Sequence, residues 1–230
     1  GRPSNHWRTG QPVRIDTGTT TPKAYRRYWK YMKRLAALCV IMLSASMVLN
    51  AYPVYFKEQY FRLYHTHYIQ YPDDTIENIY WLEQAQKADF CNPLYALAKI
   101  DDKRQWERYR YLLDMHIELK LIEQHLLLGS KFDKRVAYFF NAPWKRENLE
   151  SLKTAETAYR AALAYWKTAK DWALKAESIK WIHLPEAQFW EDEAYRIASG
   201  ELDYERIINR ELERLQSVRA QFEAMDEATY

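Results

Sequence analysis

One uninterrupted stretch, from Pro143 to about Ile182, constrains the fold of this chain more than any other feature. It contains no glycine or proline between Ser151 and Lys180. Its apolar residues alternate at steps of three and four, the spacing of a long helix with a packing seam: Leu152, Ala155, Tyr159, Ala162, Trp166, Ala169, Ala173 and Ala176. Small alanines between aromatic rings let another helix approach closely. An offset face with Tyr165, Trp172 and Ile179 predicts contacts on a second side.

Five further helices are predicted after residue 52, and no segment shows the alternation typical of a strand. They span about 53–70, 75–88, 103–128, 186–198 and 202–225, with Gly129 as the stop of the third. In the second we expect Ile76, Ile79, Tyr80 and Leu82 to face inward. The fold class is therefore all-α, an elongated bundle of long antiparallel helices. Tetratricopeptide-like packing is the alternative, although several helices are about twice as long as that repeat allows.

The N-terminal part has the pattern of an export signal. Met32-Lys33-Arg34 precedes an apolar run of 15 residues, 35–49, and Asn50-Ala51 follows it. The run is shorter than the roughly 20 residues of a membrane-spanning helix. We expect residues 1–31 to be a basic leader outside the mature protein, 32–51 a signal peptide or signal anchor, and 52–230 one α-helical domain. The predicted location is the periplasm, or the inner membrane if the anchor stays uncleaved.

The positive net charge of the chain depends on this leader. The full sequence carries a net charge of +3, but residues 1–51 hold nine basic residues and one acidic residue. The remainder has 25 basic and 30 acidic residues, a net charge of −5. A mildly acidic domain does not favour a nucleic-acid partner. Cys91 is then the one cysteine left, so no intrachain disulfide is expected.

Catalytic and metal-binding motifs are missing from the sequence. There is no G-x-S-x-G, no phosphate-binding glycine loop and no paired-cysteine zinc motif. Glu123-Gln124-His125 lacks the Glu-x-x-His spacing of di-iron bundles. On a helix, His65 and His67 point about 200° apart and cannot bind one ion together. We therefore expect no enzyme, no catalytic residue, no cofactor, no metal and no small-molecule substrate.

A row of His116, Lys120 and Glu123 on the third predicted helix has a structural explanation, a buried polar contact. As an isolated set it is weak evidence for acid–base chemistry. A metal-dependent enzyme using His65, His67 or His116 is the third hypothesis for this chain, and it would require stoichiometric metal.

Aromatic residues, 16% of the chain, suggest where partners bind. Tryptophan and tyrosine are common in helix packing and in interface hot spots, so both interpretations stay open for each ring. The segment 181–185 crosses a helix junction and favours exposure. The candidate partner-binding residues are Tyr138, Phe139, Phe140, Trp172, Trp181, Phe189 and Trp190.

Three segments carry a resemblance to a known family: Asn92-Pro93-Leu94-Tyr95-Ala96-Leu97 with Lys99-Ile100, Trp106-Glu107-Arg108-Tyr109-Arg110-Tyr111, and Lys131-Phe132-Asp133-Lys134 with Tyr138-Phe139-Phe140-Asn141. With the Ala/Tyr/Trp helix that follows, the region 89–177 resembles the flagellar collar proteins of spirochaetes. These are exported helical proteins, often repeat-containing, that build a periplasmic ring around the motor. The resemblance implies a scaffold that supports stator docking and motility, with other periplasmic helical proteins as partners.

A second hypothesis belongs to a different class of function. The Trp/Tyr-rich surface would make this chain an envelope binding module that holds peptidoglycan, glycan or lipid.

Overall fold

The computed structural model describes residues 32–34, 53–134 and 141–226. The chain divides into two compact units, 1–53 and 54–230. The described residues of the second unit form six α-helices: α2 (Lys57–Gln70), α3 (Thr75–Lys87), α4 (Lys103–Phe132), α5 (Lys145–Ser178), α6 (Gln188–Ala198) and α7 (Tyr204–Glu223). Short 3-10 turns are η1 (Pro93–Tyr95), η2 (Ala142–Trp144) and η3 (Pro185–Ala187). Within the described ranges, strand-like pairing is limited to one isolated bridge, Phe56 with Asp89. The all-α prediction is confirmed.

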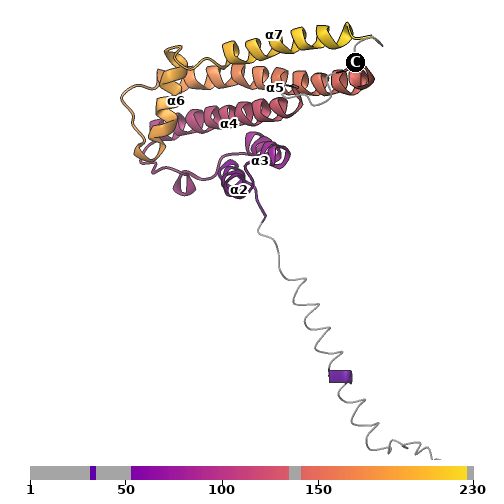
Figure 1. Ribbon diagram of the computed structural model, residues 1–230. Coiled ribbons are helices and arrows are strands. Elements are labelled where there is room, and N and C mark those ends of the chain that lie inside the picture. Colours follow the sequence, from indigo (N-terminus) through magenta and orange to yellow (C-terminus); the bar gives the residue numbers. More distant parts are fainter. Residues whose placement is uncertain (1–31, 35–52, 135–140, 227–230) are drawn as a thin grey trace, which may run out of the picture. The chain divides into compact units, whose positions relative to one another are not determined.

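The long helices α4 and α5 form the centre of this unit. They lie side by side along most of their length, with α7 on α5 and the α2–α3 pair on α4 (Figure 1). Helix α6 closes the end where α4 begins and α5 ends, and it packs against both. Helices of 30 and 34 residues are longer than a 34-residue tetratricopeptide repeat allows, since one such repeat contains two helices.

The predicted seam of α5 is buried along its whole length. All eight of its residues, from Leu152 to Ala176, are at most 2% exposed. The offset residues Tyr165 and Trp172 are half-buried and pack against the core. The central helix was thus correctly predicted, with the difference that η2 precedes it and its regular part ends at Ser178.

The prediction that helix α4 ends at Gly129 is wrong. The helix continues to Phe132, and Gly129 is a buried point of close approach. A Cβ placed there would lie 2.4 Å from Cε1 of Tyr159 on α5. The glycine is therefore explained by the ring that crosses it and not by a helix cap.

The inward face of α3 also differs from the prediction. Ile79 and Leu82 are buried as expected, but Ile76 is 65% exposed and Tyr80 is 51% exposed. Asn78 is fully buried instead, and its Nδ2 donates to the carbonyl of Tyr71 at 3.3 Å. A polar residue that ties down the α2–α3 turn takes the place expected for apolar ones.

Several predictions lie outside the described residues. They concern the leader 1–31, the apolar run 35–49 with its flank up to residue 51, and the aromatic residues Tyr138, Phe139 and Phe140. Met32–Arg34 is helical. Among the described helices, none combines the length and the apolar character needed to cross a membrane.

Candidate partner-binding site

A buried arginine of α4 fixes the end of α5. The Arg108 side chain is 7% exposed, and its Nη1 donates to the carbonyls of Ala176 and Ile179, both at 2.7 Å. Its Nη2 reaches Glu177 Oε1 at 3.2 Å and its Nε reaches Glu191 Oε1 on α6 at 3.0 Å. The last carbonyls of a helix lack partners within it and carry partial negative charge. One guanidinium therefore caps α5 and joins it to α4 and α6.

The connection from α5 to α6 is held at further points. The backbone N–H of Leu184 donates to Glu191 Oε1 at 3.3 Å, and the Leu184 side chain is fully buried. Near the start of the connection, Arg104 Nη2 donates to the carbonyl of Lys180 at 3.4 Å. The short segment between these ties, residues 181–183, is thus anchored on both sides.

Trp181 projects from this anchored segment. Its side chain is 92% exposed, the most exposed of the large apolar side chains that the structure describes. Its φ is +67°, in the left-handed region that bulky residues rarely adopt. Holding a non-glycine residue there costs about 1–3 kcal/mol, and such strain concentrates at functional sites. The folded chain therefore keeps a strained backbone at the residue that exposes its indole ring to solvent.

Two shallow hollows lie at the α5–α6 connection. One of about 290 Å³ is lined by Trp181 itself with Arg108, Glu177, Lys180, Ile182 and His183. The other, about 470 Å³, lies towards α6, where Tyr195 is exposed. Arg108 and Glu177 line both hollows and are already paired with each other. The surroundings can receive side chains of a partner, whereas the buried charges serve the fold.

The structure separates the predicted aromatic residues into two groups. Trp181 and Phe189, which is 63% exposed, face solvent. Trp172 is half-buried in a stack, 5.8 Å from the Tyr111 ring, and Trp190 is half-buried against α2 and α4, 5.2 Å from the His116 ring. Trp181 and Phe189 are thus the described candidates that a partner can reach with most of their ring.

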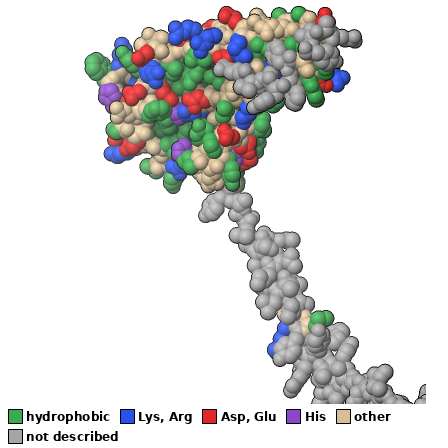
Figure 2. Space-filling model, viewed as in Figure 1, with side chains coloured by type: hydrophobic (Ala, Val, Ile, Leu, Met, Phe, Trp, Pro, Cys, Tyr) green, Lys and Arg blue, Asp and Glu red, His purple; other side chains and the backbone are tan. Residues whose placement is uncertain are grey.

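Charge on the visible surface does not single out a partner. Figure 2 shows basic and acidic side chains interspersed over the face in view, with no broad field of one sign. An interface built on this surface would depend on apolar anchors for its binding energy.

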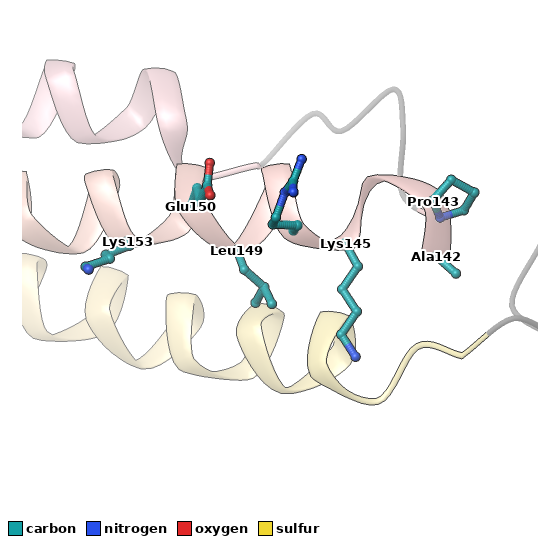
Figure 3. A pocket seen from close by; sticks show the side chains of 7 residues that line it. Ala142, Pro143, Lys145, Leu149, Glu150 and Lys153 are labelled. Carbon is teal, nitrogen blue, oxygen red and sulfur yellow. The ribbon is translucent and has the colours of Figure 1, made fainter.

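A third hollow lies at the start of α5 (Figure 3). It measures about 510 Å³ and is lined by residues of η2 and the first turns of α5. Leu149 and Lys145 point towards α7, where Lys145 Nζ donates to the carbonyls of Glu223 and Met225 at 2.7 and 3.2 Å. Lys145, one of two lysines in the lining, is thus engaged in capping α7.

Sequence reasoning missed most of the buried polar pairs between helices. His116 Nδ1 lies 2.6 Å from Glu193 Oε2 of α6, so the His116 row on α4 is in part a structural contact, as the sequence suggested. Lys120 pairs with Glu123 at 2.9 Å on the same helix. Asp133, fully buried, accepts from the Tyr159 hydroxyl at 2.9 Å. The His116–Glu193 and Asp133–Tyr159 partners are 77 and 26 residues apart, and no local pattern reveals such pairs.

A second polar group, the Lys57–Glu118 cluster, joins α2 and α3 to α4. Buried Lys57 contacts Asp114 at 2.8 Å and donates to the carbonyl of Gln86 at 3.1 Å. Gln86 Nε2 donates to Glu118 Oε1 at 2.7 Å. Burial raises the pKa of Glu118 to about 7 and also raises the pKa of Asp114, which the nearby Lys57 ammonium counteracts. The cluster joins helices, and its charges face one another within the protein.

The described geometry defines an all-α helical bundle whose polar residues fasten helix to helix and whose α5–α6 connection presents a tryptophan. A family model, Domain of unknown function (DUF8513), matches residues 104–225. The match spans more than half of the sequence, and the chain belongs to this family. It covers α4 to α7 almost completely, including Arg108 and Trp181. Searches of curated proteins and of solved structures gave no match.

Proposed function

We propose that this chain is a non-enzymatic assembly subunit that binds a protein partner through Trp181. The observation that carries the proposal is the 92% exposed indole on a left-handed backbone, held by the contacts of Arg108 and Glu191. A solvent-facing tryptophan contributes nothing to the core of its own chain. Buried in a partner, it supplies one of the largest contact areas of any side chain.

Rigid presentation strengthens this interpretation. Binding costs conformational entropy when side chains and loops become ordered at the interface. Here the connection is already tied by Arg104, Arg108 and the buried Leu184. The connection is therefore already ordered before a partner binds, so binding loses less conformational entropy there, which favours tight binding through a single anchor.

The buried charges support a role in assembly over catalysis. Glu193 and Asp133 each contact a group on another helix and line neither of the two hollows at the α5–α6 connection. An active site instead brings titratable groups together around a pocket that a substrate can enter. Buried pairs of this kind give a bundle one defined arrangement of helices, as a scaffold requires.

The cellular setting of the proposal comes from the sequence. The resemblance of 89–177 to flagellar collar proteins and the export-like pattern of 32–51 support a setting in the periplasm, where the subunit would be part of the scaffold around a flagellar motor. Its partners there would be other helical periplasmic proteins, and its loss would impair motility. The proposal of a helical assembly subunit does not depend on this setting.

The test is a crosslinked pull-down of the C-terminally tagged full chain from native envelopes, followed by mass spectrometry. The decisive variant is Trp181→Gly. Glycine adopts a φ of +67° without strain, so this variant should unfold at the same or higher temperature than the wild type. We expect the variant to capture at least about tenfold less partner than the wild type, as for other hot-spot tryptophans.

The matched control is Tyr80→Ala, which removes a half-exposed ring from α3. It should capture as much partner as the wild type. Equal capture by the Trp181→Gly variant would contradict the proposed anchor. Motor or stator proteins among the captured partners would support the flagellar setting. Recovery of cell-wall glycan alone would favour the envelope-binding function.

A further inference from the structure

Three potential metal ligands meet at the turn between α2 and α3. They are His67 near the end of α2, Asp74 at the N-cap of α3, and Glu77 in its first turn. One ligand atom from each lies within 4.8 Å of the others. His67 Nε2 is 3.7 Å from Glu77 Oε2. Two helices thus bring one imidazole and two carboxylates to a common point.

A hydrogen bond to Nδ1, on the side of the ring away from Glu77, orients His67. Its Nδ1 lies 2.9 Å from Oδ1 of Asn78, which is fully buried. The Nδ2 of Asn78 donates to the carbonyls of Tyr71 and Pro72 at 3.3 and 3.5 Å, and this sets the amide orientation. Oδ1 can only accept, so Nδ1 carries the hydrogen and a neutral ring directs its Nε2 lone pair to the carboxylates. Metal-binding histidines are oriented by such a hydrogen bond.

The carboxylates are oriented as well. Trp81 Nε1 donates to Glu77 Oε1 at 3.2 Å, which leaves Oε2 directed to His67. Asp74 Oδ1 accepts from the Glu77 backbone N–H at 3.3 Å, which leaves its second oxygen for a ligand. With a second proton on Nε2 the same geometry is a His67–Glu77 ion pair, and a metal ion would take the place of that proton. Asn78 and Trp81 are not ligands themselves, so their positions are evidence separate from the three-residue group.

We propose that His67, Asp74 and Glu77 bind one divalent transition-metal ion of the Zn²⁺ class. Zinc bonds of about 2.0–2.2 Å in a tetrahedral site place ligand atoms roughly 3.3–3.5 Å apart, close to the 3.7 Å between Nε2 and Oε2. An imidazole ligand disfavours Ca²⁺ and Mg²⁺, which take oxygen. The ion would join the end of α2 to the start of α3 across the turn at Pro72.

The site differs from the sequence expectation, which considered His65 with His67 and predicted no metal. Both histidines lie on α2, where His65 is exposed and His67 faces α3. The partners of His67 come seven and ten residues later, beyond a turn. Ligand spacing within one helix does not reveal them.

The test is isothermal titration of the metal-stripped full chain with Zn²⁺ at pH 7.5, in a buffer that does not chelate. We expect one ion per chain and a higher melting temperature with the metal bound. His67→Gln should weaken binding at least about tenfold. Glu77→Gln, which keeps the acceptor for Trp81, should also weaken it and serves if the histidine variant does not fold.

The matched control is His65→Gln, two residues away on the same helix and exposed. Its Zn²⁺ affinity should equal that of the wild type. The proposal is overturned if the wild type binds no Zn²⁺, or if the two histidine variants lose affinity equally. It is also overturned if Ca²⁺ at the same concentration displaces the ion. Circular dichroism of the metal-free variants checks that each remains folded.

Discussion

Replacing Glu118 with glutamine should stabilise the protein above neutral pH and have little effect in acid. Glu118 is 2% exposed, its Oε1 accepts from Gln86, and its Oε2 is buried with no hydrogen-bond partner. Burial raises its pKa from 4.5 to about 7, an effect partly offset by the hydrogen bond from Gln86. The side chain therefore resists ionisation in the folded state.

The sign follows from proton counting. Between about pH 4.5 and 7 the folded chain keeps a proton that the unfolded chain has released, so stability falls as pH rises through this window. The full loss is about 3 kcal/mol, because one pKa unit corresponds to about 1.4 kcal/mol. Glutamine has no charge to lose and keeps the contact with Gln86, so Glu118→Gln should recover most of this above pH 7. For a domain of this size that is about 6–12 °C in melting temperature.

Urea unfolding of both proteins at pH 4.5 and pH 8 measures the effect. The quantity of interest is the difference in the free energy of unfolding between variant and wild type at pH 8, minus the same difference at pH 4.5. This subtraction cancels the packing change and the titration that both proteins share. Glu123→Gln on the same helix is the control, since it removes only a partly exposed pair with Lys120 worth at most about 1 kcal/mol. A difference that does not depend on pH would refute the reasoning.

Two further predictions concern the joints between helices. Gly129→Ala should destabilise the protein by about 1–3 kcal/mol in urea unfolding, because the new Cβ would lie 2.4 Å from the Tyr159 ring. The Tyr159 hydroxyl donates to Asp133, which restrains the ring. An unchanged midpoint would show that the ring can move. Arg108→Met should cost about 3–5 kcal/mol by the same assay, since it leaves buried carbonyls and Glu191 without their cation; a loss below 1 kcal/mol would contradict the capping role.

The fold was predictable where the pattern is long and regular. In α5 the steps of three and four identify eight of the ten buried residues, all but Asn148 and Ala158, because a helix of 34 residues averages out local exceptions. In the 13 residues of α3 the same reasoning failed. There the burial of Asn78 shifts the inward face and leaves Ile76 exposed. A short helix has too few positions for its period to outweigh one buried polar residue.

The candidate sites were predictable only in part. Exposure of part of the segment 181–185 was expected from its place at a helix junction, while core packing stayed open for the Trp181 ring. The left-handed backbone of Trp181 and the capping by Arg108 were not expected, because Arg108 and the carbonyl of Ile179 are 71 residues apart in the chain. Contacts of this separation depend on how α4 and α5 align. Composition and local spacing contain no information on that register.

The two proposed sites are built from different parts of the chain, which makes them separable. The family match begins at residue 104 and includes each side chain that holds Trp181 in place. His67, Asp74 and Glu77 precede it, in a hairpin joined to α4 through the Lys57–Glu118 cluster. Loss of metal should therefore change the stability of α2 and α3 while partner capture through Trp181 persists. If metal removal also abolished capture, the two ends of α4 would be coupled, and the long helix would be the element that couples them.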